Sequence, residues 1–185
     1  VVDGKTLAEV KVPPVGWTTL TIEGGAKPGT HAQTPTTGDP VPAPARAAAE
    51  GPLALGKRVL ENGLLRVAFN DRGEISSIHD LEADRELSAG PCNALRMYKD
   101  VPSSFDAWDL DSMYPLTPVP LDGRATVEVL DAGPLVARLR IRRRINESDL
   151  VQVVSLRRGS RRAEFDTTVE RRESHKPLKE EFAVN

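Results

Sequence analysis

The stretch LVARLRIR, Leu135–Arg142, decides the fold of this chain, because apolar and arginine side chains alternate along it. Successive side chains of a β-strand point to opposite faces of the sheet, so the alternation predicts a strand with one buried and one solvated face. Ala125–Val129 alternates in the same way before it, and Leu150–Leu156 and Arg162–Glu170 follow the pattern after it. The four segments together predict a meander of antiparallel strands.

A hairpin is predicted upstream of the meander. Apolar residues alternate along Leu64–Phe69, and Asn70–Gly73 then supplies a turn with a glycine where a positive φ is tolerated. Glu74–Ile78 completes the hairpin. Because no stretch carries apolar residues at helical spacing, the sequence predicts an all-β fold, an antiparallel β-sandwich.

The chain divides into three zones by composition. Residues 1–23 hold two short alternating segments and predict lead-in strands. Residues 24–56 are rich in Gly, Pro, Ala and Thr, which predicts a linker or mobile loop with too little apolar surface to fold alone. Residues 57–185 form the predicted β-sandwich core. With 185 residues and 39% hydrophobic content, one globular unit is expected.

Charge and composition exclude several classes of function. The 25 Lys and Arg residues nearly balance the 27 Asp and Glu residues, so we expect neither a nucleic-acid nor a membrane partner. The start lacks a signal pattern and an initiating Met, from which we expect a cytoplasmic location and a piece of a longer protein. The single cysteine, Cys92, excludes an internal disulfide and is expected to be a small packed side chain.

Five arginines lie close together at positions 138, 140, 142, 143 and 144. Taken alone they indicate an anion-binding stripe. However, Glu128 lies on the preceding predicted strand, and Glu164, Asp166 and Glu170 lie on a later one. We therefore expect a solvated face on which cross-strand ion pairs balance the arginines.

The histidines give no sign of a metal site. His31, His79 and His175 stand far apart, and none has a cysteine partner or another ligand at a short metal-binding spacing. No zinc site is predicted within the chain.

The stretch Asp100–Asp111 is the candidate binding loop, because it packs four acids and two aromatic rings between strand-like segments. Asp106, Trp108 and Asp109 are the candidate substrate-binding residues. In one interpretation the acids accept sugar hydroxyls or act as a general acid/base pair, and Trp108 or Phe105 is a platform for a sugar ring. In the other, the carboxylates accept backbone N–H groups to shape the loop, and Trp108 packs into the sandwich core.

Several segments, in their order and spacing, resemble the C-terminal β-sandwich region of glycoside hydrolase family 38, the α-mannosidases. The resemblance covers most of the chain outside residues 24–56, although phenylalanine stands at position 105 and tryptophan at position 17, where the family usually has tryptophan and tyrosine. The matching segments are Val12–Trp17, Leu60–Val67, Gly73–Asp80, Asp100–Asp109 and Glu173–Asn185.

The resemblance implies what the rest of the protein does. Members of this family are retaining exo-α-mannosidases, with two catalytic carboxylates and a zinc ion held mainly in an N-terminal barrel that a helical domain follows. The chain would then be a non-catalytic sandwich, similar to the galactose-mutarotase-like (supersandwich) fold and truncated at its C-terminal end. Its partners would be the rest of the parent chain and carbohydrate, and its loops would extend to the substrate cleft.

Two rival interpretations remain from the residues alone. The first is a stand-alone carbohydrate-binding or protein-interaction sandwich. The second is a mutarotase-like enzyme, which needs a His and Glu pair acting on a free sugar. The isolated His79 and His175 do not supply such a pair.

Overall fold

The computed structural model describes residue 3, residue 54 and residues 56–185 apart from 103, 106 and 107. The predicted lead-in strands, nearly all of the predicted linker and the candidate residue Asp106 lie outside the described residues. Apart from Asp3, the described residues belong to one compact unit, Ala48–Asn185.

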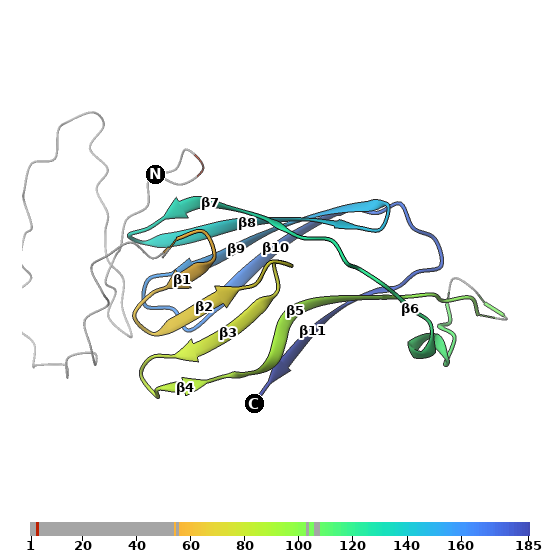
Figure 1. Cartoon of the computed structure of the whole chain (residues 1–185), viewed down its shortest axis with the longest axis horizontal. Helices are drawn as coiled ribbons and strands as arrows, with labels where there is room; N and C mark the ends of the chain where they lie inside the picture. The colour runs from red at the N-terminus through yellow and green to blue at the C-terminus, as the bar shows by residue number, and fades with distance from the viewer. Residues whose placement is uncertain (1–2, 4–53, 55, 103, 106–107) are drawn as a thin grey trace, which may run out of the picture. The chain divides into compact units, whose positions relative to one another are not determined.

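The described residues form β-strands, one short 3-10 helix and no α-helix, and none of them forms a helix long and apolar enough to cross a membrane (Figure 1). The elements are β1 (Val59–Glu61), β2 (Leu65–Phe69), β3 (Ile75–Asp80), β4 (Arg85–Glu86), β5 (Ser88–Tyr98), η1 (Tyr114–Leu116), β6 (Pro118–Val119), β7 (Thr126–Ala132), β8 (Val136–Ile145), β9 (Ser148–Arg157), β10 (Ala163–Glu170) and β11 (Leu178–Val184).

The described strands pair antiparallel in two sheets. One sheet has the order β1-β2-β3-β5-β11, with β4 paired to β3 and β6 paired to β5. The other has the order β10-β9-β8-β7, in which neighbours in sequence are neighbours in space. Figure 1 shows the two sheets as separate layers. Both the predicted all-β sandwich and the predicted meander are confirmed.

Apolar side chains of the two sheets meet in a shared core. Cys92 is fully buried there, as the sequence predicts, and burial raises the pKa of its thiol. Because the core draws on both sheets, neither sheet is a stable unit by itself. The fully or nearly fully buried residues of this core are Leu60, Val67, Phe69, Ile75, Cys92, Ala137, Leu139, Ile141, Val154 and Leu156.

The predicted hairpin is formed by β2 and β3. Its turn is held by Asn70, whose Oδ1 accepts hydrogen bonds from the backbone N–H groups of Arg72 at 2.9 Å and Glu74 at 3.1 Å. Gly73 adopts a φ of 73°, in the left-handed region. The sequence predicted a glycine at this turn position because glycine tolerates a positive φ. The turn also touches the other sheet, since Ala125 N donates to Asp71 O at 2.9 Å.

The predicted charge pairing on β8 is confirmed in part. Arg140 lies directly opposite Glu128 in the β7–β8 register, and their side chains approach to 3.3 Å. Glu164 pairs with Arg157 of β9 rather than with an arginine of β8. The prediction is wrong for Arg143, which is buried. Counting by twos from Ile141 puts Arg143 on the core face of the strand.

Glu86 fastens β3, β4 and β5 together. Its carboxylate accepts hydrogen bonds from Ile78 N at 2.8 Å, Ser88 N at 2.9 Å, Ser77 Oγ at 2.6 Å and Ser88 Oγ at 2.5 Å. Burial pushes the pKa of Glu86 upward, but these four hydrogen bonds outweigh it and lower the pKa to about 2.

The stability of the fold is therefore expected to depend on pH through Glu86. Because the folded pKa lies below the unfolded value, the contribution is complete above about pH 4.5 and is lost as the pH falls towards about 2. After a discount for the solvent that reaches this side chain, Glu86→Gln should lower stability at pH 7 by about 1–2 kcal/mol. Urea unfolding of the unchanged protein and of the variant, at a series of pH values from 7 to 2, measures the difference in stability. An equal loss of stability on acidification in both proteins would contradict this role.

Candidate functional site

The candidate loop leaves the sandwich at the end of β5 and returns at β6, and its base is firmly held. Lys99 N donates to Thr117 O at 2.9 Å, and Thr117 Oγ1 donates to Lys99 O at 2.9 Å. The Asp100 carboxylate, whose residue is only 8% exposed, accepts Asp111 N at 2.8 Å. The loop is therefore closed at its base by the hydrogen bond between Asp100 and Asp111.

The described acids of this loop shape its backbone. Asp109 Oδ1 accepts Leu110 N at 2.9 Å, and Asp111 Oδ1 accepts Met113 N at 2.9 Å. Phe105 takes a φ of 57°, and its carbonyl accepts Trp108 N at 2.8 Å and Asp109 N at 2.9 Å. These local hydrogen bonds support the interpretation in which the carboxylates hold an irregular loop in shape.

The large apolar side chains of the loop point into solvent. Trp108 is 92% exposed and Phe105 is 78% exposed. The alternative in which Trp108 packs into the sandwich core is therefore wrong, because the loop carries it away from both sheets. Exposed apolar groups gathered on one connection mark a binding or contact surface. The same loop also exposes Val101, Leu110, Met113 and Leu116.

The far end of the loop is tied to β5 and β11 through Tyr114. The rings of Tyr98 and Tyr114 meet edge to face with centroids 5.2 Å apart. Lys179 Nζ lies 4.3 Å from the centroid of the Tyr114 ring, where a cation is attracted by the ring face. The exposed side chains thus stand on a support that is anchored at both ends.

A polar groove lies beside the base of the loop. Asp100 N donates to His175 O at 2.8 Å, which joins the loop to the connection between β10 and β11. The hollow has a volume of about 440 Å³. We name it the Arg171 groove after one of its lining residues, which are Asp100, Arg171, Ser174, His175, Lys176 and Pro177.

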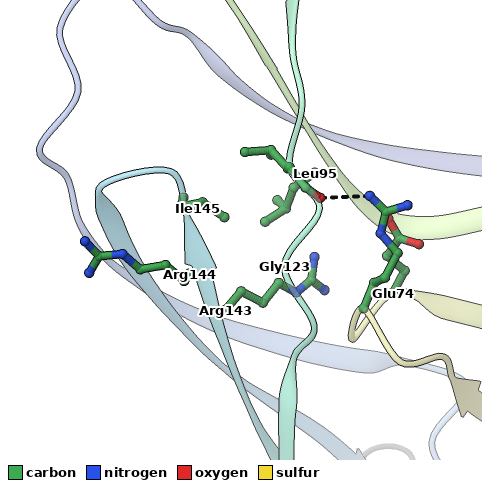
Figure 2. A pocket seen from close by; sticks show the side chains of 8 residues that line it. Glu74, Leu95, Gly123, Arg143, Arg144 and Ile145 are labelled. Atoms are coloured by element: carbon green, nitrogen blue, oxygen red, sulfur yellow. Dashed lines mark hydrogen bonds between the residues drawn. The ribbon is translucent and has the colours of Figure 1, made fainter.

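A second polar cluster lies inside the sandwich and joins its two sheets. Arg143 is 7% exposed, and its guanidinium donates to Asn93 O at 3.2 Å and to Gly73 O. The side-chain amides of Asn93 and Gln152 pair reciprocally at 3.1 and 3.0 Å. Figure 2 shows Arg143 pointing towards Gly123 and Glu74, and the next residue of β8, Arg144, pointing the opposite way.

This interior cluster has no space for an organic ligand. The cavity beside Arg143 and Glu74 measures about 20 Å³, which is room for one water molecule. Burial lowers the pKa of Arg143, and the charges of Glu74 and Glu180 oppose that effect. The cluster is therefore a structural link between the sheets.

Metal ligands do not converge among the described residues. No group of three or more His, Cys, Asp or Glu side chains in that part of the chain is placed to hold a metal ion. His79 Nε2 lies 3.1 Å from Asp84 Oδ1, and His175 belongs to the Arg171 groove instead. The described residues thus do not fit the zinc ion that the resemblance implies for the parent enzyme.

The fold and the loop together define a β-sandwich domain that exposes aromatic and other apolar side chains on one connection. The sequence profile described as "Glycosyl hydrolases family 38 C-terminal domain" matches residues 60–185. The chain belongs to glycosyl hydrolase family 38, as a C-terminal domain.

The curated relatives are much longer than this chain. Alpha-mannosidase 2C1 of Homo sapiens is 34% identical over 131 residues, a match that covers 69% of this chain and 13% of that protein. Alpha-mannosidase 2C1 of Mus musculus is likewise 34% identical over 131 residues, with the same coverage. The matched region thus spans about one eighth of the length of these relatives.

Sequence reasoning named some residues of this region and missed others. Trp108 and Asp109 lie on the exposed loop, as predicted, and Asp106 is outside the described residues. Asp100, which closes the loop, and Arg171 and Lys176, which line the neighbouring groove, were not singled out. The sequence feature that could have pointed to Arg171 and Lys176 is the group of cations that follows the strand ending at residue 170.

Proposed function

We propose that this chain is a non-catalytic domain of an α-mannosidase-like glycoside hydrolase, and that its loop from Lys99 to Thr117 contacts the catalytic part of the parent protein at the substrate cleft. The observation that carries the proposal is the exposure of Trp108 and Phe105 on a loop with an anchored base. A rigid support that presents aromatic rings is suited to a sugar face or to a neighbouring domain.

The rest of the reaction belongs to the rest of the parent. The catalytic carboxylates and the zinc ion are proposed to lie in a barrel outside this chain, with this domain supporting that barrel. Carbohydrate and the remainder of the parent chain are the proposed partners, with no nucleic acid and no membrane. We also propose a cytoplasmic location for the parent enzyme.

A stand-alone carbohydrate-binding sandwich is the second candidate, and the exposed Trp108 ring is the observation that favours it. It differs from the first in one measurable respect. A stand-alone module binds sugar as the isolated chain, whereas a domain that only completes a cleft needs the catalytic part beside it.

In the parent enzyme, Trp108→Ala is expected to lower kcat/KM for an aryl α-mannoside by about tenfold, the equivalent of about 1.4 kcal/mol. Loss of the ring removes a contact at the cleft without disturbing the core, since the side chain is 92% exposed. The unfolding midpoint of the isolated chain should therefore stay unchanged. Steady-state kinetics and urea unfolding measure the two effects.

Val184→Ala is the matched control, because it shortens an exposed apolar side chain that lies on β11, outside the loop. It should leave kcat/KM within about twofold of the unchanged enzyme, a difference of about 0.4 kcal/mol. The isolated chain should not hydrolyse the mannoside with or without added zinc. Turnover by the isolated chain, or full activity of the Trp108 variant, would rule out the proposal. Sugar binding by the isolated chain would favour the stand-alone module.

A further inference from the structure

The connection between β10 and β11, which forms most of the Arg171 groove, is fixed to the rest of the fold. The Glu173 carboxylate accepts hydrogen bonds from Glu147 N at 2.6 Å, Ser148 N at 3.1 Å and the Ser148 hydroxyl. Arg172 N donates to Ser148 Oγ at 2.8 Å, and Tyr98 N donates to Pro177 O at 3.2 Å. The backbone that forms the base of the groove is therefore held in place by hydrogen bonds.

Two cations line this groove, and neither forms a salt bridge within the described residues, although Lys176 helps to lower the pKa of the nearby Glu173 carboxylate. Arg171 Nη2 donates to Lys176 O at 2.5 Å, which positions the guanidinium and leaves its other N–H groups available. Neither Arg171 nor Lys176 forms an ion pair with an acid of the described residues. The adjacent Arg172 is different, since it pairs with Glu170 at 2.6 Å.

The other lining groups complete a recognition site of mixed polarity. Ser174 supplies a hydroxyl, His175 an imidazole, and Asp100 a carboxylate of which Oδ1 accepts a backbone hydrogen bond from Asp111. Among the charged lining residues, the two cations Arg171 and Lys176 outnumber the one acid, Asp100. A volume of about 440 Å³ suits a ligand the size of a substituted monosaccharide.

We propose that the Arg171 groove binds a phosphate group, with Arg171 and Lys176 as its charge partners. Guanidinium and ammonium groups form short, charge-assisted hydrogen bonds with phosphate oxygens, and the anchored Arg171 loses little freedom on binding. Asp100 also lines the hollow, and a carboxylate there would accept hydroxyl donors, which favours phosphate carried on a sugar over free phosphate. The site is independent of the role given above to Trp108.

The test is a titration of the 185-residue chain with a hexose monophosphate, with inorganic phosphate and with the unphosphorylated hexose, followed by calorimetry or NMR. The hexose monophosphate is expected to bind with a millimolar dissociation constant of about 1–10 mM. Arg171→Gln and Lys176→Gln should each weaken this binding by about tenfold. Tighter binding of the hexose monophosphate than of inorganic phosphate identifies the sugar-borne group, and equal binding identifies free phosphate.

Arg172→Gln is the matched control, because it removes the neighbouring cation that is paired with Glu170. It should leave the dissociation constant within about twofold. Unfolding midpoints of the three variants check that each is folded. The proposal is overturned if neither phosphate compound binds below about 50 mM. It is also overturned if Arg172→Gln weakens binding as much as Arg171→Gln does.

Discussion

Gly73→Ala is expected to lower the free energy of unfolding by about 2–5 kcal/mol, because the alanine meets two separate obstacles. The first is the backbone, since Gly73 has a φ of 73° and a Cβ is disfavoured there. The second is space. A Cβ at this position lies 2.5 Å from Ile141 Cγ2 and 2.9 Å from Ala125 Cβ. Ile141 is fully buried and has no room to retreat.

Gly159→Ala separates the two obstacles. Gly159 has a similar φ of 68°, but a Cβ there meets nothing within 4 Å. Its alanine variant should therefore lose only the backbone term, about 1–2 kcal/mol. Urea unfolding followed by circular dichroism gives both values. Equal losses in the two variants would contradict the close approach of the Gly73 turn to β8.

The position of Gly73 shows how far sequence reasoning reaches in this fold. The turn Asn70–Gly73 and its positive φ follow from local turn chemistry, which a single stretch of sequence reveals. The contact of that turn with Ile141 does not, because it joins residues far apart in the chain and depends on how the sheets pack. The strands could also be predicted, because the alternation of apolar and polar residues is visible within a single stretch of sequence.

The candidate loop shows the same limit. Its position between strands could be predicted from its Pro and Ser residues. That its acids accept hydrogen bonds could be predicted from the residue type. The exposure of Trp108 could not, because an aromatic ring is compatible with a core or with a surface until the path of the loop is known. The role of Asp100 was hidden for a similar reason, since its hydrogen bonds with Asp111, at the other end of the loop, and with His175, far along the chain, are not local.

Arg143 was misplaced for a different reason, because the local pattern contained the answer. Leu139 and Ile141 mark the core face of β8, and two residues further on the same face holds Arg143. Three consecutive arginines at 142, 143 and 144 carry the same charge, so the sequence gives no contrast between the two faces of the strand at these positions. Burial of the middle arginine is stabilised by carbonyl acceptors on the opposite sheet, which no local pattern reveals.

Arg143→Met is expected to lower the free energy of unfolding by about 2–4 kcal/mol. Methionine fills much of the same space but removes the guanidinium donors from the Gly73 and Asn93 carbonyls, of which Gly73 O keeps only the long hydrogen bond from Asn93 Nδ2 at 3.4 Å. Relief from burying a charge offsets part of the loss, since burial disfavours the charged guanidinium. The hydrogen bonds should prevail because the nearby Glu74 carboxylate, which is also buried, offsets part of the cost of burying the guanidinium.

Arg142→Met tests whether the effect belongs to the interior. Arg142 is the neighbouring residue on the exposed face of β8, and its loss should change stability by no more than about 0.5 kcal/mol. Arg143→Lys should fall between the two, because one ammonium cannot reach both carbonyls with the geometry of the planar guanidinium. If Arg143→Met is as stable as the unchanged protein, the cost of burying the charge equals the value of its hydrogen bonds. Arg143 would then contribute no net stability to the link between the two sheets.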